Sequence, residues 1–448
     1  MSRSIKEGSV EAPTRHPIPW RDPAYHDEAE LEAELRRVFD ICHGCRRCFN
    51  LCDSFPRLFD LVDASATGEL DAVASADFKP VVDACTLCDM CFMTKCPYVP
   101  PHEFNVDFPH LMLRARAVEG RRAGVSFADR ELARTDRNGR LASIAPSLAN
   151  WASATGNRLT RPLLERVGGV HREAELPRYH APTFQAEAAV PAIDRRAPAF
   201  GRKAVLYATC FVNYNEPGIG RAARAVLAKN GVETRVEHPV CCGMPQLEQG
   251  DLAEVADRAC RVSAALLPLV VDGYAIVALV PSCALMLKFE WPLILPEDEG
   301  VRRLAAATMD LSQYVVDLAR DEGLAQGMTP LERGVTLHLA CHARAQNMGA
   351  KAAEMLRLIP GADVEVIERC SGHGGSWGVK KDNFDVAMKV GKPVARQAAR
   401  SPERVLASEC PLAAMHIAQG MRRLDEPVPD ARGLHPIVLM ARAYGLEP

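Results

Sequence analysis

The second half of the chain alternates short apolar runs with longer amphipathic stretches, and this alternation occurs twice. Short apolar runs are typical of buried strands, whereas apolar residues that recur with a helical period indicate helices. The pattern predicts strands at 204–207, 233–237, 275–280, 335–339, 364–367 and 404–407. It predicts helices at 218–229, 252–270, 351–358 and 384–398. Alternating strands and helices favour parallel pairing through right-handed crossovers, so two tandem α/β halves are expected.

The first 200 residues have a different, mainly helical pattern. Leu31, Leu35 and Val38 follow one another at helical spacing. The expected segments are a flexible arm at 1–28, a helical domain at 29–115, a helical and proline-rich linker at 116–200, and α/β halves at 201–330 and 331–448. The linker is expected to pack on its neighbours; the alternative is a docking surface for a membrane or for a partner protein. The predicted fold class is therefore α+β and multidomain.

Composition and charge narrow the class of protein. The 448 residues are 48% hydrophobic and 25% charged, as in soluble globular proteins. A net charge of −3 and an aromatic content of 6% argue against a nucleic-acid partner. The N-terminus lacks the apolar core of a secretory signal, and no uncharged apolar run reaches the ~18 residues that span a bilayer. We expect a cytoplasmic protein and leave open a peripheral association with the cytoplasmic face of the inner membrane.

The sixteen cysteines are the most informative feature of the composition. In a reducing cytosol, closely spaced cysteines are more often metal ligands than disulfide partners. The first eight form two runs, C-x2-C-x2-C-x3-C and C-x2-C-x2-C-x4-C. In two-cluster ferredoxins, three cysteines of each run hold one 4Fe–4S cluster and the fourth ligates the other cluster. We therefore assign one cluster to Cys42, Cys45, Cys48 and Cys96, and the other to Cys85, Cys88, Cys91 and Cys52.

A pair of zinc sites is the alternative for these runs, but zinc leaves the third and fourth cysteines of each run unexplained. Two features depart from a minimal ferredoxin: Asp53 rather than proline follows Cys52, and the second run has one extra residue before Cys96. Neither departure removes a ligand. The helical domain at 29–115 is thus expected to be a dicluster ferredoxin-like domain.

The remaining cysteines follow the α/β repeat. One cysteine stands just after each predicted strand, and the offsets between the halves are 131, 129 and 127 residues. This indicates a tandem duplication with sites at the carboxyl ends of the strands. The candidate metal ligands are Cys210, Cys241, Cys242 and Cys283 in the first half, and Cys341, Cys370 and Cys410 in the second.

The second half lacks one of these thiols. Ser371 stands where the first half has Cys242, so only three thiols are left. His373, in the same glycine-rich loop, is a candidate fourth ligand or proton donor, and the alternative is an ordinary loop histidine. Cys260 lies mid-helix and off the repeat, so we expect a buried core thiol. No residue is assigned to catalysis.

These motifs together resemble a known family. Two 4Fe–4S motifs followed by HPVCCGMPQ and its degenerate copy ERCSGHGGS resemble the iron–sulfur oxidoreductases related to the iron–sulfur subunit of anaerobic glycerol-3-phosphate dehydrogenase and to heterodisulfide reductase. The resemblance covers residues 40–110 and 203–420. It implies two tandem CCG (cysteine-rich) half-domains after the ferredoxin-type domain. The first half lacks a fifth cysteine, which places the non-cubane cluster of heterodisulfide reductases in doubt.

The resemblance implies an electron-transfer component of an oxidoreductase rather than a complete enzyme. It would relay electrons between a flavoprotein or rubrerythrin-like partner and another acceptor, with the quinone pool as a candidate. Its cofactors would be two 4Fe–4S clusters, with a further iron–sulfur cluster in the CCG repeat left open. The alternative function is a self-contained, heterodisulfide reductase-like thiol or disulfide reductase in which the CCG site is catalytic.

Overall fold

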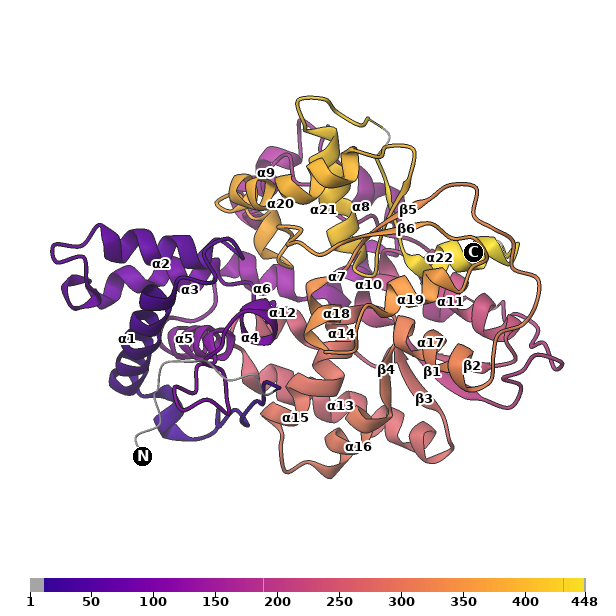
Figure 1. The fold of residues 1–448 in the computed structure, drawn as a ribbon, viewed down its shortest axis with the longest axis horizontal. Coiled ribbons are helices and arrows are strands. Elements are labelled where there is room, and N and C mark those ends of the chain that lie inside the picture. The colour runs from indigo at the N-terminus through magenta and orange to yellow at the C-terminus, as the bar shows by residue number, and fades with distance from the viewer. Residues whose placement is uncertain (1–11, 188, 430, 447–448) are drawn as a thin grey trace.

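The computed structural model describes residues 12–187, 189–429 and 431–446, and Figure 1 shows three bodies in contact. The N-terminal domain lies at one side, and the two α/β halves lie beside each other. The N-terminal domain is helical: α1 (Glu28–Cys45), α2 (Ser54–Asp63), α3 (Lys79–Ala84), α4 (Met90–Thr94) and α5 (Phe108–Ala123). Asp27 caps α1 by accepting from the Glu30 N–H, and α1 ends at Arg46, whose backbone is left-handed.

Each α/β half contains a parallel four-stranded sheet. The first has the order β2-β1-β3-β4, and the second has the matching order β6-β5-β7-β8. The first sheet comprises β1 (Lys203–Tyr207), β2 (Glu233–Glu237), β3 (Ala275–Ala278) and β4 (Thr308–Asp310). The second comprises β5 (Val335–His338), β6 (Val364–Ile367), β7 (Val405–Ser408) and β8 (Gly433–Leu434). The tandem α/β prediction is confirmed, and both halves keep the same strand order.

The helices between the strands follow the sequence pattern closely. In the first half they are α10 (Thr209–Tyr214), α11 (Pro217–Lys229), α12 (Met244–Leu247), α13 (Leu252–Val271), α14 (Pro281–Leu285), a π-helical turn (Met286–Glu290), α15 (Trp291–Ile294), α16 (Glu299–Ala307) and α17 (Leu311–Asp321). In the second half they are α18 (Cys341–Ala345), α19 (Lys351–Arg357), α20 (Phe384–Ala399), α21 (Pro411–Arg422) and α22 (Pro436–Ala443). The last helix, α22, packs against α11 and therefore ties the end of the chain to the first half.

The linker forms four short helices that contact both halves. They are α6 (Phe127–Ala133), α7 (Thr135–Ala142), α8 (Pro146–Ser153) and α9 (Arg161–Gly168). Helix α6 contacts α12, and α7 contacts α10, both in the first half. Just after α9, Val170 bridges to Lys380 and the His171 ring stacks on Phe384 of the second half. The linker is thus a strap across the two halves.

Part of the expected flexible arm is fixed in place. Arg15 donates to Asp89 at 2.7 Å, to Asp107 at 3.0 Å and to Glu290 at 3.1 Å. These three ion pairs hold the Arg15 segment against the rest of the protein. The polar, proline-rich composition of the segment gives no sign of them. The described residues of the arm therefore join the N-terminal domain to the first half, whereas residues 1–11 lie outside the described part.

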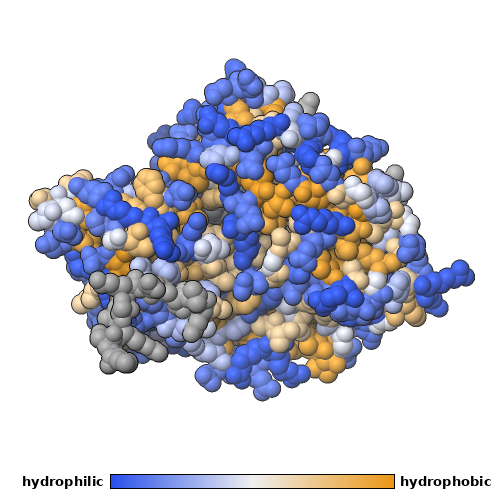
Figure 2. Space-filling view, in the orientation of Figure 1, coloured by the Kyte–Doolittle hydropathy of each residue, from blue (hydrophilic) through white to orange (hydrophobic). Residues whose placement is uncertain are grey.

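Within the described ranges, no helix combines the length and the apolar character needed to cross a bilayer. The face of the molecule in Figure 2 is hydrophilic along most of its rim, with apolar patches around its middle. Several apolar side chains of the linker helices are exposed, among them Leu148, Trp151 and Leu163.

Candidate functional site

The first four candidate ligands line one cavity in the N-terminal domain. Cys42 and Cys45 lie in the last turn of α1, Cys48 lies in the following turn, and Cys96 arrives from the segment after α4. Their cavity has an apolar wall that includes Phe59. Burial, followed by the neighbouring thiols of Cys96, Cys48 and Cys45, raises the pKa of Cys42 well above its ordinary value. The structure thus places Cys96 beside the first cysteine run.

The second group has the complementary membership. Burial and the nearby thiols of Cys88 and Cys85 raise the pKa of Cys52 well above its ordinary value. The pKa of Cys91 rises through burial and the same two neighbours, with Cys48 and Cys52 next. The structure therefore brings Cys52 to the second run, and Cys48 and Cys91 place the two groups side by side. Ligation by these crossed sets stays a prediction.

Backbone geometry lets the second run turn around its own interior. Leu87 and Asp89 both adopt left-handed conformations, at φ 48° and 63°. Asp89 is held by Arg15, as described above, while Arg116 of α5 donates to the carbonyls of Val82 and Cys85. Such supports fix the thiols before any ligand binds, which is what a cluster site requires.

The three thiols of the second half lie against this second group. Burial, then the neighbouring thiols of Cys88, Cys370 and Cys410, raises the pKa of Cys341 well above its ordinary value. His342, next to Cys341, donates through Nε2–H to the Leu87 carbonyl at 3.4 Å. The second half is thus in direct contact with the loop of the second cysteine run.

His373 sits in a buried cluster of imidazoles. Burial, followed by the neighbouring His416 and His342, lowers the pKa of His373 to about 3, so the ring is neutral at physiological pH. Its ring centroid lies 6.3 Å from that of His416. A neutral imidazole suits a metal ligand as well as a structural role, so ligation by His373 stays a prediction.

The four thiols of the first half follow the carboxyl ends of β1, β2 and β3. The sulfurs of Cys242 and Cys283 are 3.3 Å apart, and Trp291 donates to the Cys242 carbonyl at 3.1 Å. Gly243 has φ 90°, a conformation that favours glycine and lets the chain turn after the paired cysteines. Tyr207 lies beside the thiols, which together with burial raise its pKa well above the ordinary value.

Cys241 differs from the other thiols of this group. The neighbouring Cys210 and Cys242 thiols lower its pKa most, and Thr135 and the Gly243 N–H add to them, so the pKa falls well below the ordinary value against the effect of burial. Cys241 is thus the position where the protein itself favours a thiolate. A group of four neighbouring thiols, three of them buried, matches the donor set of an iron–sulfur site.

Comparison with known proteins identifies these two halves. A family model described as a cysteine-rich domain, CCG, matches residues 204–288 and again residues 335–418. The chain carries two CCG domains.

Three relatives extend the likeness beyond these domains. A subunit of anaerobic glycerol-3-phosphate dehydrogenase from Escherichia coli K12 is 27% identical over 317 residues, which cover 70% of this chain and 76% of that protein. A subunit of fumarate reductase (CoM/CoB) from Methanothermobacter marburgensis is 28% identical over 250 residues, covering 54% of this chain and 47% of that protein. Lactate utilization protein A of Bacillus pumilus is 26% identical over 236 residues, which cover 50% of this chain and 94% of that protein.

The chain is homologous to these proteins, two of which are subunits of a dehydrogenase and a reductase by name. It is therefore related to subunits of oxidoreductases. This relationship supports a redox partner. Among the described residues, no three His, Cys, Asp or Glu side chains are arranged to hold a single metal ion. A cubane takes one thiolate at each iron and does not need its ligands to converge on one ion.

The two CCG sites are neighbours across the domain boundary. Burial raises the pKa of Cys410, in the second CCG domain, to about 11. The adjacent Glu409 adds to this rise, and so does Cys283 from the first CCG domain. All fifteen predicted ligands thus fall into four groups, and each group is close enough to the next to shift the pKa of one of its thiols. The prediction for Cys260 is wrong: this thiol is exposed on α13, because its helix position faces outward near Asp298.

Residues that no motif reveals also reach the first CCG site. Asp136 of the linker accepts from the Cys241 backbone N–H at 2.7 Å and from the His238 Nε2–H at 2.8 Å. No sequence motif marks Asp136, which lies in the first turn of α7 (Thr135–Ala142).

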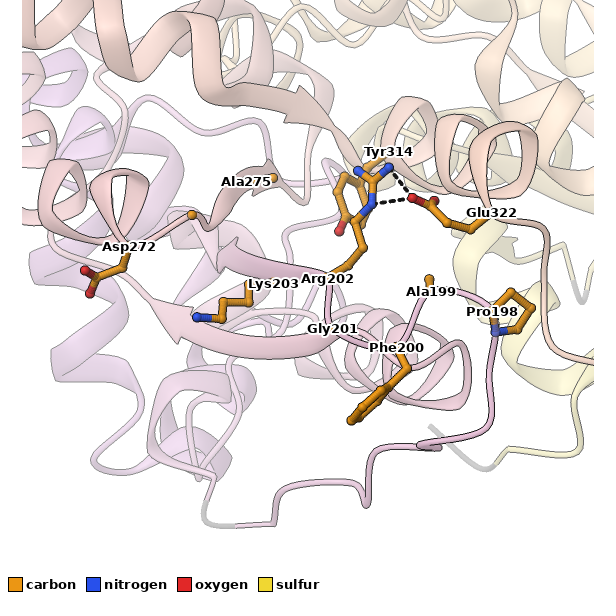
Figure 3. A pocket seen from close by; sticks show the side chains of 11 residues that line it. Pro198, Ala199, Phe200, Gly201, Arg202, Lys203, Asp272, Ala275, Tyr314 and Glu322 are labelled. Atoms are coloured by element: carbon orange, nitrogen blue, oxygen red, sulfur yellow. Dashed lines mark hydrogen bonds and ion pairs between the residues drawn. The ribbon is translucent and has the colours of Figure 1, made fainter.

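A separate hollow of about 580 Å³ lies at the opposite end of the first sheet (Figure 3). Lys203 and Ala275, at the amino ends of β1 and β3, line it, and Arg202 donates to Glu322 at 2.7 Å on its wall. Its lining contains no cysteine. In the two α/β halves, the candidate cysteine ligands therefore lie near the carboxyl ends of the strands, where open α/β sheets place their ligands.

Proposed function

We propose that the chain relays electrons through two 4Fe–4S clusters in its ferredoxin-like N-terminal domain to a site in its CCG domains. The observation that carries this proposal is the series of four cysteine groups. Cys48 is near enough to Cys91 to raise its pKa, Cys88 and Cys370 act on Cys341 in the same way, and Cys283 acts on Cys410. Bound in these groups, iron–sulfur clusters would accept and release single electrons.

The residues present fit such clusters. The thiols of both N-terminal groups are buried or half-buried beside one another, and burial raises the pKa of Cys48 and of Cys88 to about 12. A set of protonated, crowded thiols is poorly solvated, whereas iron stabilises the thiolates and removes that cost. The second CCG domain offers three thiols, so a cluster there is less well supported than in the first CCG domain.

The outer end of the series suggests where a partner docks. Arg47 and Lys95 are exposed beside Cys48, whose pKa they lower against the stronger effect of burial. Phe49 is also exposed in the same turn. A basic rim around an apolar residue suits a partner with an acidic docking face. We propose a flavoprotein dehydrogenase there, with a rubrerythrin-like protein as the second candidate donor or acceptor.

We further propose that the protein binds a membrane surface peripherally and that the quinone pool is its electron acceptor. The exposed apolar residues of α8 and α9 provide its surface, and Arg158 and Arg166 lie near them in the sequence. Amphipathic helices with basic flanks bind anionic bilayers. Sedimentation with vesicles of anionic phospholipid should carry the wild-type chain down, and Trp151→Ser should weaken this at least severalfold.

Anaerobic purification with iron and sulfide counts, combined with EPR, tests the relay itself. We expect at least eight irons per chain. Cys96→Ala should remove the signal of the cluster held by Cys42, Cys45 and Cys48, and Cys52→Ala should remove the other one. Cys260→Ala is the matched control, because it removes an exposed thiol outside the four groups. Zinc without iron would overturn the relay, and loss of the opposite signal in Cys96→Ala would overturn the crossed ligand sets.

The alternative, a self-contained thiol or disulfide reductase, needs the CCG site to react with substrate. The activated position of Cys241 favours it, whereas the three-thiol second domain does not. Addition of a small heterodisulfide to the reduced protein distinguishes the two functions. A catalytic CCG site would be oxidised by the disulfide without any partner protein, while a relay would keep its electrons until a protein acceptor is added.

A further inference from the structure

A helix from outside the CCG repeat forms one wall of the first CCG site. Asp136 lies in the first turn of α7, and its two carboxylate oxygens have different partners. Oδ2 accepts from the Cys241 N–H at 2.7 Å, and Oδ1 accepts from His238 Nε2–H at 2.8 Å. Arg258 Nη1 approaches Oδ2 at 3.5 Å. Three bonds from the first CCG domain therefore hold one carboxylate of the linker.

The neighbouring Thr135 lies near the same thiol. Its hydroxyl is buried and has no hydrogen-bond partner in the structure, and it is close enough to Cys241 to lower the pKa of that thiol. A buried hydroxyl without a partner is costly unless something at the site accepts its proton. A cluster bound at Cys241 would offer such an acceptor.

Helix α7 is locked in position, so these contacts are not accidental surface pairings. A Cβ at Gly139 would lie 2.3 Å from Cδ2 of Tyr214, so only glycine lets α7 approach α10 this closely. Gln246 of the first CCG domain donates to the Ala133 carbonyl just before α7, at 2.8 Å. The linker and the cysteine loop are thus joined on both sides of Asp136.

These contacts have opposite electrostatic consequences for a group bound at Cys241. A carboxylate next to the cysteine loop opposes the negative charge that reduction adds. A hydroxyl that donates to the sulfur favours the added negative charge. Net charge and hydrogen bonds to sulfur are the features by which proteins set cluster potentials.

We propose that Thr135 and Asp136 complete the first CCG site from the linker: both position Cys241, Asp136 lowers the reduction potential of the group bound there, and Thr135 raises it. This inference rests on the proposed function, because it assumes that the first CCG domain holds a cluster. It adds two residues to the site from a segment that the CCG model does not match.

Potentiometry followed by EPR on the full-length protein tests the proposal. Asp136→Asn should move the midpoint of the third signal, that of the first CCG domain, to a more positive potential. Thr135→Val should move it to a more negative potential. Iron content and both N-terminal signals should stay unchanged. The control is Asp129→Asn on the neighbouring helix α6, which removes the same charge from the ion pair with Lys380 and leaves the site alone.

Shifts of opposite sign cannot arise from a common loosening of α7, so they separate electrostatic control from a purely structural role. If both variants keep their iron but the third midpoint does not move, or moves in the same direction in both, this inference is overturned while the relay stands. If the wild-type protein shows no third signal at all, the proposed cluster in the first CCG domain and this inference fail together. Should Asp136→Asn lose iron, Thr135→Val decides by the sign of its shift.

Discussion

The two CCG domains share a strand order but differ in what surrounds their cysteines. In the first domain, four thiols gather beside Tyr207, and the linker supplies a further wall through Asp136. In the second domain, three thiols face the loop of an N-terminal cysteine run, and His373 lies among other imidazoles. Duplication thus preserved the scaffold and left the site to be completed by whichever segment packs over the strand ends.

This difference separates the tasks of the two domains. The thiols of the second domain adjoin an N-terminal group directly, whereas Cys283 of the first domain adjoins Cys410 of the second. A redox site that lies between two others in the relay needs close contacts on both sides. A site at the end of the relay needs only one neighbour but an enclosed set of ligands of its own. The four-thiol site of the first domain fits the terminal role, and the predictions below test that contrast.

The largest effect is expected from removing one thiol of the first domain. Cys283→Ala should abolish the third EPR signal and lower the iron count, because Cys242 then loses the thiol 3.3 Å away. Cys370→Ala should have a smaller effect on that signal. Cys260→Ala, the exposed thiol of α13, should leave iron and signals unchanged. If Cys370→Ala removes the third signal and Cys283→Ala spares it, the roles of the two domains are reversed.

A gain of ligand tests the same contrast from the other side. Ser371 occupies the place that Cys242 has in the first domain, 129 residues earlier. Ser371→Cys restores a fourth thiol, so the second domain should retain more iron after anaerobic desalting than in the wild type. Ser401→Cys is the control: it adds a thiol at the opposite end of the second sheet, so it should not increase the iron that the protein retains. Equal iron in all three proteins would mean that the missing thiol is not what limits this site.

Much of this architecture is readable from the sequence, and the reason is local. The strands and the cysteines that follow them are set by apolar runs and spacing, so Cys210 and Cys341 fall where the duplication places them. Strands β4 and β8 are missed because they have only three and two residues, too few for a pattern. Asp136 and Arg15 are missed because their partners are distant in sequence, and no local signal marks a tertiary contact.

A smaller, pH-dependent effect is expected where the two CCG domains meet. Burial raises the pKa of Glu248 from 4.5 to about 7, and Arg116 and Lys380 only partly offset this. The carboxyl lies against Gly375 and Ser376 of the second domain. The folded state therefore holds this proton more tightly than the unfolded state, so stability is lost as the pH rises from about 4.5 to about 7.

Glu248→Gln removes that dependence. At pH 8 the variant should be more stable than the wild type by at most roughly 3 kcal/mol, and at about pH 4.5 the difference should largely vanish. Urea midpoints at the two pH values measure this, with Glu297→Gln, an exposed carboxyl of the same domain, as the control. A difference that does not change with pH would show that the carboxyl is not the titrating group.

The smallest effect concerns the contact between the second CCG domain and the second cysteine run. Gly374 has φ 55°, and a Cβ there would lie 2.6 Å from Cγ2 of Thr86. Gly361 has φ 66° but no atom within 4 Å of such a Cβ. Gly361→Ala should therefore cost about 1 kcal/mol through backbone strain alone, and Gly374→Ala should cost about 1–2 kcal/mol more through the clash with Thr86.

The double variant Gly374→Ala, Thr86→Ala isolates that contact, because it keeps the backbone strain and removes the clashing methyl group. Its stability should return to about that of Gly361→Ala, as expected when two neighbouring substitutions couple. If the excess cost persists without the Thr86 methyl, the loop is not pressed against the cysteine run. The second CCG domain would then lack the close contact that an intermediate station requires, and the contrast between the two domains would have to rest on their thiols alone.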